Sequence, residues 1–356
     1  MHSRFILFFT FIIVSTTLRA DVLKNIEQHV IEFQREQSPA VSYAVTHKGK
    51  LIYAGGAGKA NLELAVAAHN ETVFRIASIT KQFTSTAIMM LQEQNKLSIK
   101  DNINQYLPGF STKGNTITIE NLLNHTSGIK ITPSFISQLD VKDNTAASPD
   151  EMLAWLAKEV VFTEPRTEFS YNFINYNLLG KIIEITSGVS YKTFIEENIF
   201  KKVGMHNSQY DGPQLILNRA TGYSLNKNKE YQHAQFVDMT WPYASGAIVS
   251  TPTDLGIWHN ALINGKLISH ESYKAMTTPL KLKNGQEYPY GFGLFIEKIG
   301  MFSTVHHGGN LPGFASDSLY FPEKELYISV MMNGDGYARP LSLSIAAEVL
   351  GIESIM

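Results

Sequence analysis

Ser78 and Lys81 stand three residues apart at the start of a predicted helix. Apolar residues follow at helical spacing, namely Phe83, Ala87, Met90 and Leu91. Residues three apart share one face of a helix, so the serine hydroxyl and the lysine amine can meet. A lysine can take the proton of a serine once burial or a nearby cation lowers its pKa, and a helix N-terminus favours developing negative charge. The pair therefore predicts covalent chemistry at Ser78.

A second serine precedes a lysine by three residues, at Ser224 and Lys227. About one such pair is expected by chance in a chain of this length. The second pair lies in a polar stretch with no apolar periodic run after it, so we expect a solvated loop there. Its context favours Ser78 as the nucleophile.

The composition limits the classes of function. The 356 residues are 44% hydrophobic and 17% charged, with a net charge of −2. The sequence has no basic patch or charge run, which argues against a nucleic-acid partner or a disordered tail. This length can form one large domain or two closely joined lobes.

The first twenty residues resemble an export signal. His2 and Arg4 precede an apolar run over residues 5–14, and Ala20 ends the segment. This layout predicts a signal peptide over 1–20 and a periplasmic or secreted protein. The run is short for a membrane span, so no stable span is expected after cleavage. The chain has no cysteine, which fits a bacterial envelope protein better than a small disulfide-stapled one.

Strands are expected near both ends of the chain and helices between them. The predicted strands are 41–45, 51–54, 290–297, 317–321 and 326–332, with glycines 55, 56 and 58 releasing the chain from the sheet. The predicted helices are 21–37, 119–124, 176–186, 252–263, 340–350, one from Gln82 and one opened by Ser148 and Pro149. The pattern predicts an α/β (α+β) fold, with a sheet lobe over roughly 21–60 and 286–356 and a helical lobe over roughly 61–285. A cleft between the lobes is the expected site.

Five segments together resemble the penicillin-recognising serine hydrolases, the group that holds class C β-lactamases, D-alanyl-D-alanine carboxypeptidases and related esterases. They are residues 78–81, 122–129, 176–180, 245–251 and 307–314. Each segment is a weak signal, but five in the order and spacing of the family are hard to obtain by accident. The resemblance covers nearly all of residues 21–356 and implies an antiparallel sheet flanked by the terminal helices, with a helical lobe inserted.

The resemblance assigns further site residues. His307, Gly308 and Gly309 match the family's third element, a substrate-binding edge strand that faces the nucleophile. The backbone N–H groups of Ser78 and Asn310 would form the oxyanion hole, and His307 would face a substrate carboxylate or polarise the site. A metal pair at His306 and His307 is disfavoured because adjacent side chains on a strand point to opposite faces, so no metal or cofactor is expected.

The second element departs from the family pattern. Tyr171 matches its tyrosine, but Phe173 occupies the place of its asparagine. Asn172 or Asn175 could supply the amide if the loop is shifted. Packing of Tyr171 as a plain aromatic residue is the alternative to catalysis.

The implied mechanism is acyl transfer through a covalent Ser78 ester. Tyr171 and Lys81 share the proton transfers, and the sequence leaves open which is the general base. The expected function is an exported hydrolase for esters or D-amino-acid peptides. A β-lactamase and a catalytically weak protein that binds peptidoglycan-type ligands are the alternatives.

Overall fold

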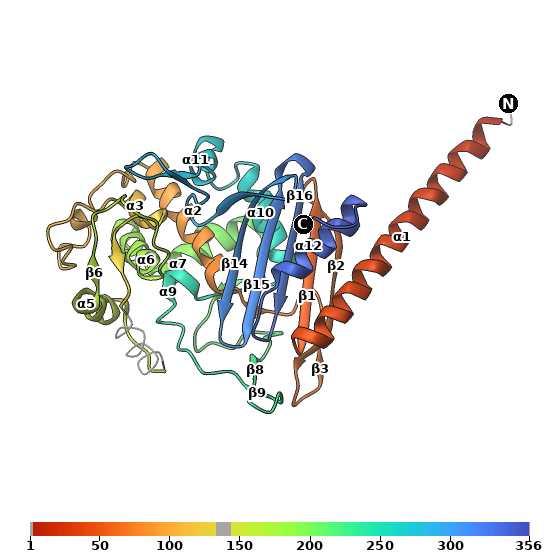
Figure 1. Cartoon of the computed structure of the whole chain (residues 1–356), viewed down its shortest axis with the longest axis horizontal. Helices are drawn as coiled ribbons and strands as arrows, with labels where there is room; N and C mark the ends of the chain where they lie inside the picture. The colour runs from red at the N-terminus through yellow and green to blue at the C-terminus, as the bar shows by residue number, and fades with distance from the viewer. Residues whose placement is uncertain (1–2, 133–143, 356) are drawn as a thin grey trace.

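A seven-stranded antiparallel sheet combines the two ends of the chain (Figure 1). The computed structural model describes residues 3–132 and 144–355. The strand order is β13-β14-β15-β16-β1-β2-β3, and the two ends join where Val41 of β1 pairs with Met332 of β16. The strands are β1 (Ala40–His47), β2 (Lys50–Asn61), β3 (Val66–Ala67), β13 (Phe295–Ile299), β14 (Phe302–Leu311), β15 (Phe314–Phe321) and β16 (Leu326–Met332). The predicted fold class is confirmed.

Helices cover both faces of this sheet. Helices α1 (Ser3–Gln37) and α12 (Arg339–Leu350) lie on the outer face, where Ile26, Val30 and Ile345 are buried against the strands (Figure 1). Burial of each such side chain contributes about 1.5–3 kcal/mol. Helix α10 (Pro252–Ile263) packs on the inner face, where the Ser329 hydroxyl donates to the Pro252 carbonyl at 2.8 Å.

The remaining elements are helices, short helical turns and small sheets. The helices are α2 (Thr80–Glu93), α3 (Ile119–Leu123), α5 (Pro149–Glu159), α6 (Ile174–Ser187), α7 (Tyr191–Ile195), α8 (Lys201–Val203), α9 (Tyr243–Gly246) and α11 (His270–Met276). Short helical turns are η1 (Ala77–Ile79), η2 (Ile103–Gln105), η3 (Glu196–Phe200) and η4 (Pro322–Lys324). Small sheets pair β4 (Phe74–Arg75) and β7 (Gln209–Tyr210) with β10 (Ile248–Ser250), β5 (Ile129–Lys130) with β6 (Val161–Phe162), β8 (Tyr223–Leu225) with β9 (Tyr231–His233), and β11 (Leu280–Lys281) with β12 (Glu287–Tyr288).

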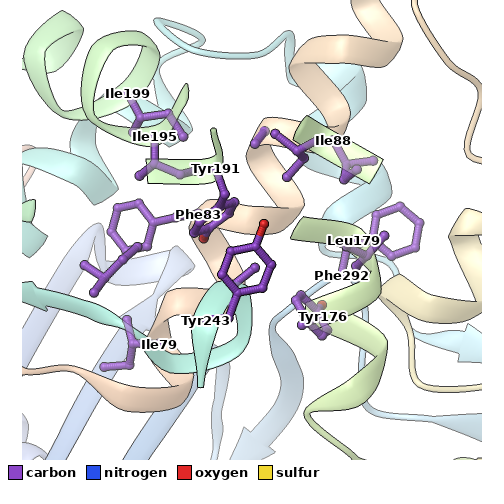
Figure 2. Packing of buried hydrophobic residues seen from close by; sticks show 14 of the residues in the cluster. Ile79, Phe83, Ile88, Tyr176, Leu179, Tyr191, Ile195, Ile199, Tyr243 and Phe292 are labelled. Atoms are coloured by element: carbon purple, nitrogen blue, oxygen red, sulfur yellow. The ribbon is translucent and has the colours of Figure 1, made fainter. Parts of the chain in front are cut away.

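Helix α2 forms the centre of the main core. Every residue from Thr80 to Leu91 is buried, so the helix is enclosed on all sides rather than amphipathic. The Phe83 ring lies 4.1 Å from the Trp258 ring, centroid to centroid, among the apolar side chains drawn in Figure 2. The polar Thr84 is accommodated because its hydroxyl donates to the Ala244 carbonyl at 2.6 Å. The helix that follows the candidate nucleophile and carries Lys81 is thus held firmly in the core.

Several local predictions need correction. The glycines of β2 do not release the chain, because the strand continues to Asn61. A Cβ atom at Gly56 would lie 2.9 Å from the His69 backbone, so glycine there permits a close approach of two backbones. The predicted strand at 290–297 begins only at Phe295. Ser224 lies in the short strand β8 of a hairpin rather than in a loop.

Other predictions agree with the structure. Ser148 caps α5 in a capping box with Glu151, with Pro149 in the first turn. The helix predicted over 21–37 is continuous with residues 3–20 as α1, while residues 1 and 2 of the expected export signal lie outside the described residues. Within the part of the chain that the structure describes, no helix is both long and apolar enough to span a membrane.

Candidate active site

Ser78 lies in the tight turn η1 between strand β4 and helix α2. The preceding residue, Ala77, has a φ of +47°, a left-handed backbone conformation that non-glycine residues seldom adopt. Such strain is characteristic of functional sites, where the surrounding structure holds it in place. The turn places Ser78 immediately before the N-terminus of α2, as the sequence predicts.

Lys81 reaches back to the serine. Its Nζ donates to Ser78 Oγ at 3.1 Å and to the Ser245 carbonyl at 3.0 Å. The side chain is 1% exposed, and burial lowers the pKa of Lys81 from 10.5 to about 7. A neutral amine is therefore well populated near neutral pH. The Ser245 contact was missed in the sequence, because nothing in the 245–251 segment indicates that a backbone carbonyl would hold the lysine.

Tyr171 completes a small group around the nucleophile. The Lys81 Nζ lies 4.9 Å from the centroid of the Tyr171 ring. Although 41% of the tyrosine remains exposed, burial raises its pKa above the ordinary value of 10, and a hydrogen bond with Ser78 opposes the rise only in part. The phenol is therefore protonated at neutral pH, which makes it a proton donor rather than a base.

The amide missing at Phe173 is not replaced by either neighbouring asparagine. Asn172 Nδ2 donates to the carbonyls of Ile129 and Ser170, at 3.2 and 2.9 Å. Asn175 Oδ1 accepts from the Ser127 hydroxyl at 2.7 Å. Both side chains thus hold the loop that carries Tyr171, and of the two only Asn172 also lines the pocket, next to Phe173.

His125 supports Tyr171 from behind. Its ring is fully buried and lies 4.5 Å from the Tyr171 ring, centroid to centroid. Asn175 Nδ2 lies 3.0 Å from His125 Nδ1, and an amide nitrogen can only donate, so the imidazole proton is assigned to Nε2. Burial, aided by Lys81 and His307, lowers the pKa of His125 well below 6.5, so the ring is neutral.

The third element lies on β14, partly as expected. Strand β13 covers β14 only as far as His306, so β14 is not the edge strand but its last residues, from His307 on, extend past its neighbour. Asn310 is exposed and lines the pocket beside Ser78. Gly309 lies behind the nucleophile, since a Cβ atom there would be 2.2 Å from the Ile76 carbonyl oxygen.

His307 differs from the expectation. The residue is 3% exposed and does not line the pocket. Its Nδ1 lies 2.6 Å from the Gly308 carbonyl and its Nε2 lies 3.3 Å from the Tyr290 hydroxyl. Burial, with Lys81 nearby, lowers its pKa to about 3. A neutral, buried imidazole lacks the positive charge that a carboxylate clamp needs, so the structure gives no support to that expectation. His306 instead contacts Glu297 and Arg339, so the two histidines do point apart.

The pocket in front of Ser78 has a volume of about 450 Å³. Ser78, Lys81, Tyr171 and Asn310 all line it, whereas His307, Gly308 and Gly309 do not. The rest of its wall is largely apolar, with Ile131, Phe173, Val237, Trp241, Leu311 and Pro312, and the polar residues Asn172, Gln235 and Ser245 also line it. The arrangement can bind an apolar group beside an activated serine.

Comparison with known proteins agrees with this geometry. The family model described as Beta-lactamase matches residues 24–349. A Bacillus subtilis protein named as a candidate penicillin-binding protein, PbpX, is 30% identical over 288 residues, which cover 81% of this chain and 68% of that protein.

Two solved structures share the fold. The octameric penicillin-binding protein homologue from Pyrococcus abyssi is 30% identical, with a TM-score of 0.80 over 92% of this chain and 77% of that one. The D-amino acid amidase from Ochrobactrum anthropi SV3 is 21% identical, with a TM-score of 0.82 over 93% of this chain and 99% of that one. With the family model spanning nearly the whole sequence, this chain belongs to the β-lactamase family of serine hydrolases.

Proposed function

We propose that this chain is an exported hydrolase that cleaves esters or D-amino-acid amides and peptides through a Ser78 acyl-enzyme. One observation carries the proposal: Lys81 Nζ lies 3.1 Å from Ser78 Oγ, and burial lowers its pKa to about 7. A binding protein gains nothing from a buried lysine, whose desolvation destabilises the fold. A serine hydrolase that uses a lysine as its general base needs that amine to be neutral at working pH.

The proposed reaction begins with proton transfer from Ser78 Oγ to neutral Lys81 Nζ. The serine oxygen attacks the substrate carbonyl, and the N–H groups of Ser78 and Asn310 stabilise the oxyanion. Tyr171 donates its phenolic proton to the leaving oxygen or nitrogen and recovers one from Lys81. Water then attacks the ester and gives a proton to Lys81, which passes it to Ser78 Oγ as the acyl–oxygen bond breaks, so that Ser78 and the carboxylic acid product are released.

The choice of substrate follows from the pocket wall and the missing amide. An apolar pocket of about 450 Å³ fits a hydrocarbon or aromatic acyl group. Phe173 offers no hydrogen bond to a lactam or peptide carbonyl, so activated esters, which need less help to expel their leaving group, are favoured over penicillins. The amidase likeness adds only that the fold accommodates amide substrates.

Export is the proposed cellular context. It rests on the charged, apolar and small-residue order of residues 1–20. Expression of the full chain in a Gram-negative host, followed by fractionation and N-terminal sequencing, should give a periplasmic protein that starts at Asp21. Retention of residues 1–20 in the cytoplasmic fraction would contradict export.

Active-site labelling tests the reaction. A fluorophosphonate should label the wild-type chain and the Ser224→Ala variant equally, because the hairpin serine has no base arranged around it. Ser78→Ala should abolish labelling. Labelling of Ser78→Ala at the wild-type rate would overturn the nucleophile assignment. A fluorescent penicillin separates the alternatives: rapid labelling and release would indicate a β-lactamase, whereas no covalent labelling by either probe would indicate a binding protein.

A further inference from the structure

A second cavity adjoins the active-site pocket. It has a volume of about 420 Å³ and shares Asn310, Leu311 and Pro312 with the first, so the two cavities meet at the end of β14. Its other wall is formed by Asp335, Gly336 and Tyr337, which follow strand β16. A substrate held at Ser78 can therefore extend across Asn310 into the second cavity.

Few charged side chains line this path, and the accessible charge is negative. Among the described residues that line the two cavities, only Lys81 and Asp335 carry ionisable charge. Lys81 is buried and its donors face Ser78 and Ser245. His307 is neutral and outside the pocket. A substrate carboxylate consequently meets no available cation, whereas a substrate cation meets Asp335.

Asp335 is held in position by the fold. Its Oδ1 accepts from the Gly313 N–H at 2.8 Å, in the turn between β14 and β15. That turn cannot shift easily, because a Cβ atom at Gly313 would lie 2.8 Å from the Tyr223 backbone nitrogen on its other side. Among the described residues the Asp335 carboxylate accepts only from the Gly313 N–H, through Oδ1, so Oδ2 is available to a ligand.

Tyr337 supplies a second feature suited to a cation. The residue is 75% exposed on the same wall. An aromatic face attracts ammonium and guanidinium groups through its quadrupole, most strongly when a carboxylate lies nearby to add Coulomb attraction. A carboxylate and an aromatic ring beside an otherwise apolar cleft are the chemistry of a cation-binding subsite.

We propose that Asp335 and Tyr337 form a subsite for a positively charged group of the substrate. The inference rests on the proposed function and narrows it to esters or amides that carry an apolar group near the scissile bond and an ammonium or guanidinium group beyond it. The subsite contacts the substrate without taking part in bond cleavage.

Matched isosteres test this subsite. One pair places the charge on the leaving group: acetylthiocholine against the thioester with tert-butyl in place of trimethylammonium. The other pair places it on the acyl group, as p-nitrophenyl esters of trimethylammonio-butanoate and its tert-butyl isostere. In the pair whose charge lies on the side of the subsite, the cationic substrate should have a kcat/KM about three- to twentyfold higher than its neutral isostere. This is the range expected for an exposed ion pair together with a cation–π contact. Added salt should reduce the preference.

Variants of Asp335 and Tyr337 test whether these residues cause the preference for a cationic substrate. Asp335→Asn keeps an oxygen for the Gly313 N–H and removes the charge, so the cationic preference should fall to within twofold while the neutral isostere keeps its turnover. Tyr337→Ala should lose part of the preference. Glu287→Gln, an exposed carboxylate that lines neither cavity, is the control and should change nothing.

Two results would overturn the subsite: equal kcat/KM within both pairs, or a cationic preference that survives Asp335→Asn. Failure of the hydrolase assignment would look different, because no ester would be cleaved and fluorophosphonate would not label Ser78. In that case calorimetric binding of acetylthiocholine to the Ser78→Ala chain, with and without Asp335→Asn, still decides whether the cation site exists.

Discussion

Among single residues, Lys81 gives the clearest indication of function. Its two hydrogen-bond acceptors among the described residues, Ser78 Oγ and the Ser245 carbonyl, are neutral. Burial without a carboxylate partner is unfavourable for the charged amine, which is why the pKa falls to about 7. The same burial raises the pKa of Tyr171. The two shifts favour the roles in the proposed reaction, with Lys81 as base and Tyr171 as acid.

The pH dependence of acylation should follow Lys81. Because only the neutral amine can accept the serine proton, kcat/KM for a neutral ester should rise tenfold per pH unit below about 7 and level off above about 8. Initial rates from pH 5.5 to 9 measure this. Lys81→Ala should lower kcat/KM by about a thousandfold or more, since the pair acts as a unit. A profile that rises only above pH 9 would point to another base.

His307 should not affect the pH dependence of KM. Its pKa of about 3 lies below the working range, so the ring stays neutral from pH 5.5 to 8. The pH dependence of KM should therefore be the same for an acidic ester and a neutral ester of equal length. Selective weakening of the acidic substrate as pH rises through 6.5 would show that His307 does act as a carboxylate clamp.

At the scale of elements, four segments position the nucleophile: η1, α9, the end of β14 and the start of β15. The Ser316 hydroxyl donates to the Ile76 carbonyl at 2.9 Å and fixes the entry to the turn. The backbone of Gly309 packs against the same carbonyl. Helix α9 supplies the Ser245 carbonyl that holds Lys81. The strained φ of Ala77 is maintained by these contacts from both sides.

Two adjacent glycines of β14 give a matched test of this positioning. A Cβ atom at Gly309 would lie 2.2 Å from the Ile76 carbonyl oxygen and 2.5 Å from Ser316 Oγ, whereas at Gly308 the nearest atom is 3.6 Å away. Gly309→Ala should therefore displace the Ser78 turn and lower the rate of fluorophosphonate labelling about a hundredfold, as expected for a shift of about 1 Å. Gly308→Ala should label at nearly the wild-type rate. Similar rates for the two variants would show that the close approach does not control the nucleophile.

The whole molecule shows which features a sequence can predict. Hydrophobic periodicity and caps locate α5, α10 and the terminal strands because these signals are local. The Ser78–Lys81 contact was predictable because helix geometry fixes it over one turn. The Ser245 carbonyl, the role of the β2 glycines and the neutral state of His307 depend on which segments meet in the folded chain. No local pattern encodes these contacts between distant segments.

Four buried histidines make the stability of the whole molecule depend on pH. Burial lowers the pKa of four imidazoles: His259 and His307 to about 3, His306 to about 2, and His125 well below 6.5. In the unfolded chain each would take up a proton near pH 6.5. The unfolded state therefore binds more protons between pH 6.5 and 3. Their contribution to stability is complete above pH 6.5 and is lost as the pH falls towards the folded values.

Acid should accordingly destabilise the chain well before its exposed carboxylates titrate. The three histidines whose pKa falls to about 2 or 3 each cost about 2 kcal/mol at pH 5, which together is a large part of the stability of a typical domain. We expect the free energy of unfolding, from urea titrations followed by circular dichroism, to fall steeply between pH 7 and 5.

His259 isolates the effect because it lies on α10, outside the active-site pocket, with its ring stacked on Tyr327 at 4.3 Å. His259→Phe preserves the stacking and should reduce the loss over this range by about 2 kcal/mol. His47→Gln, at an exposed position on β1, should leave it unchanged. If His259→Phe and wild type lose the same stability between pH 7 and 5, buried neutral histidines do not set the acid limit of this fold.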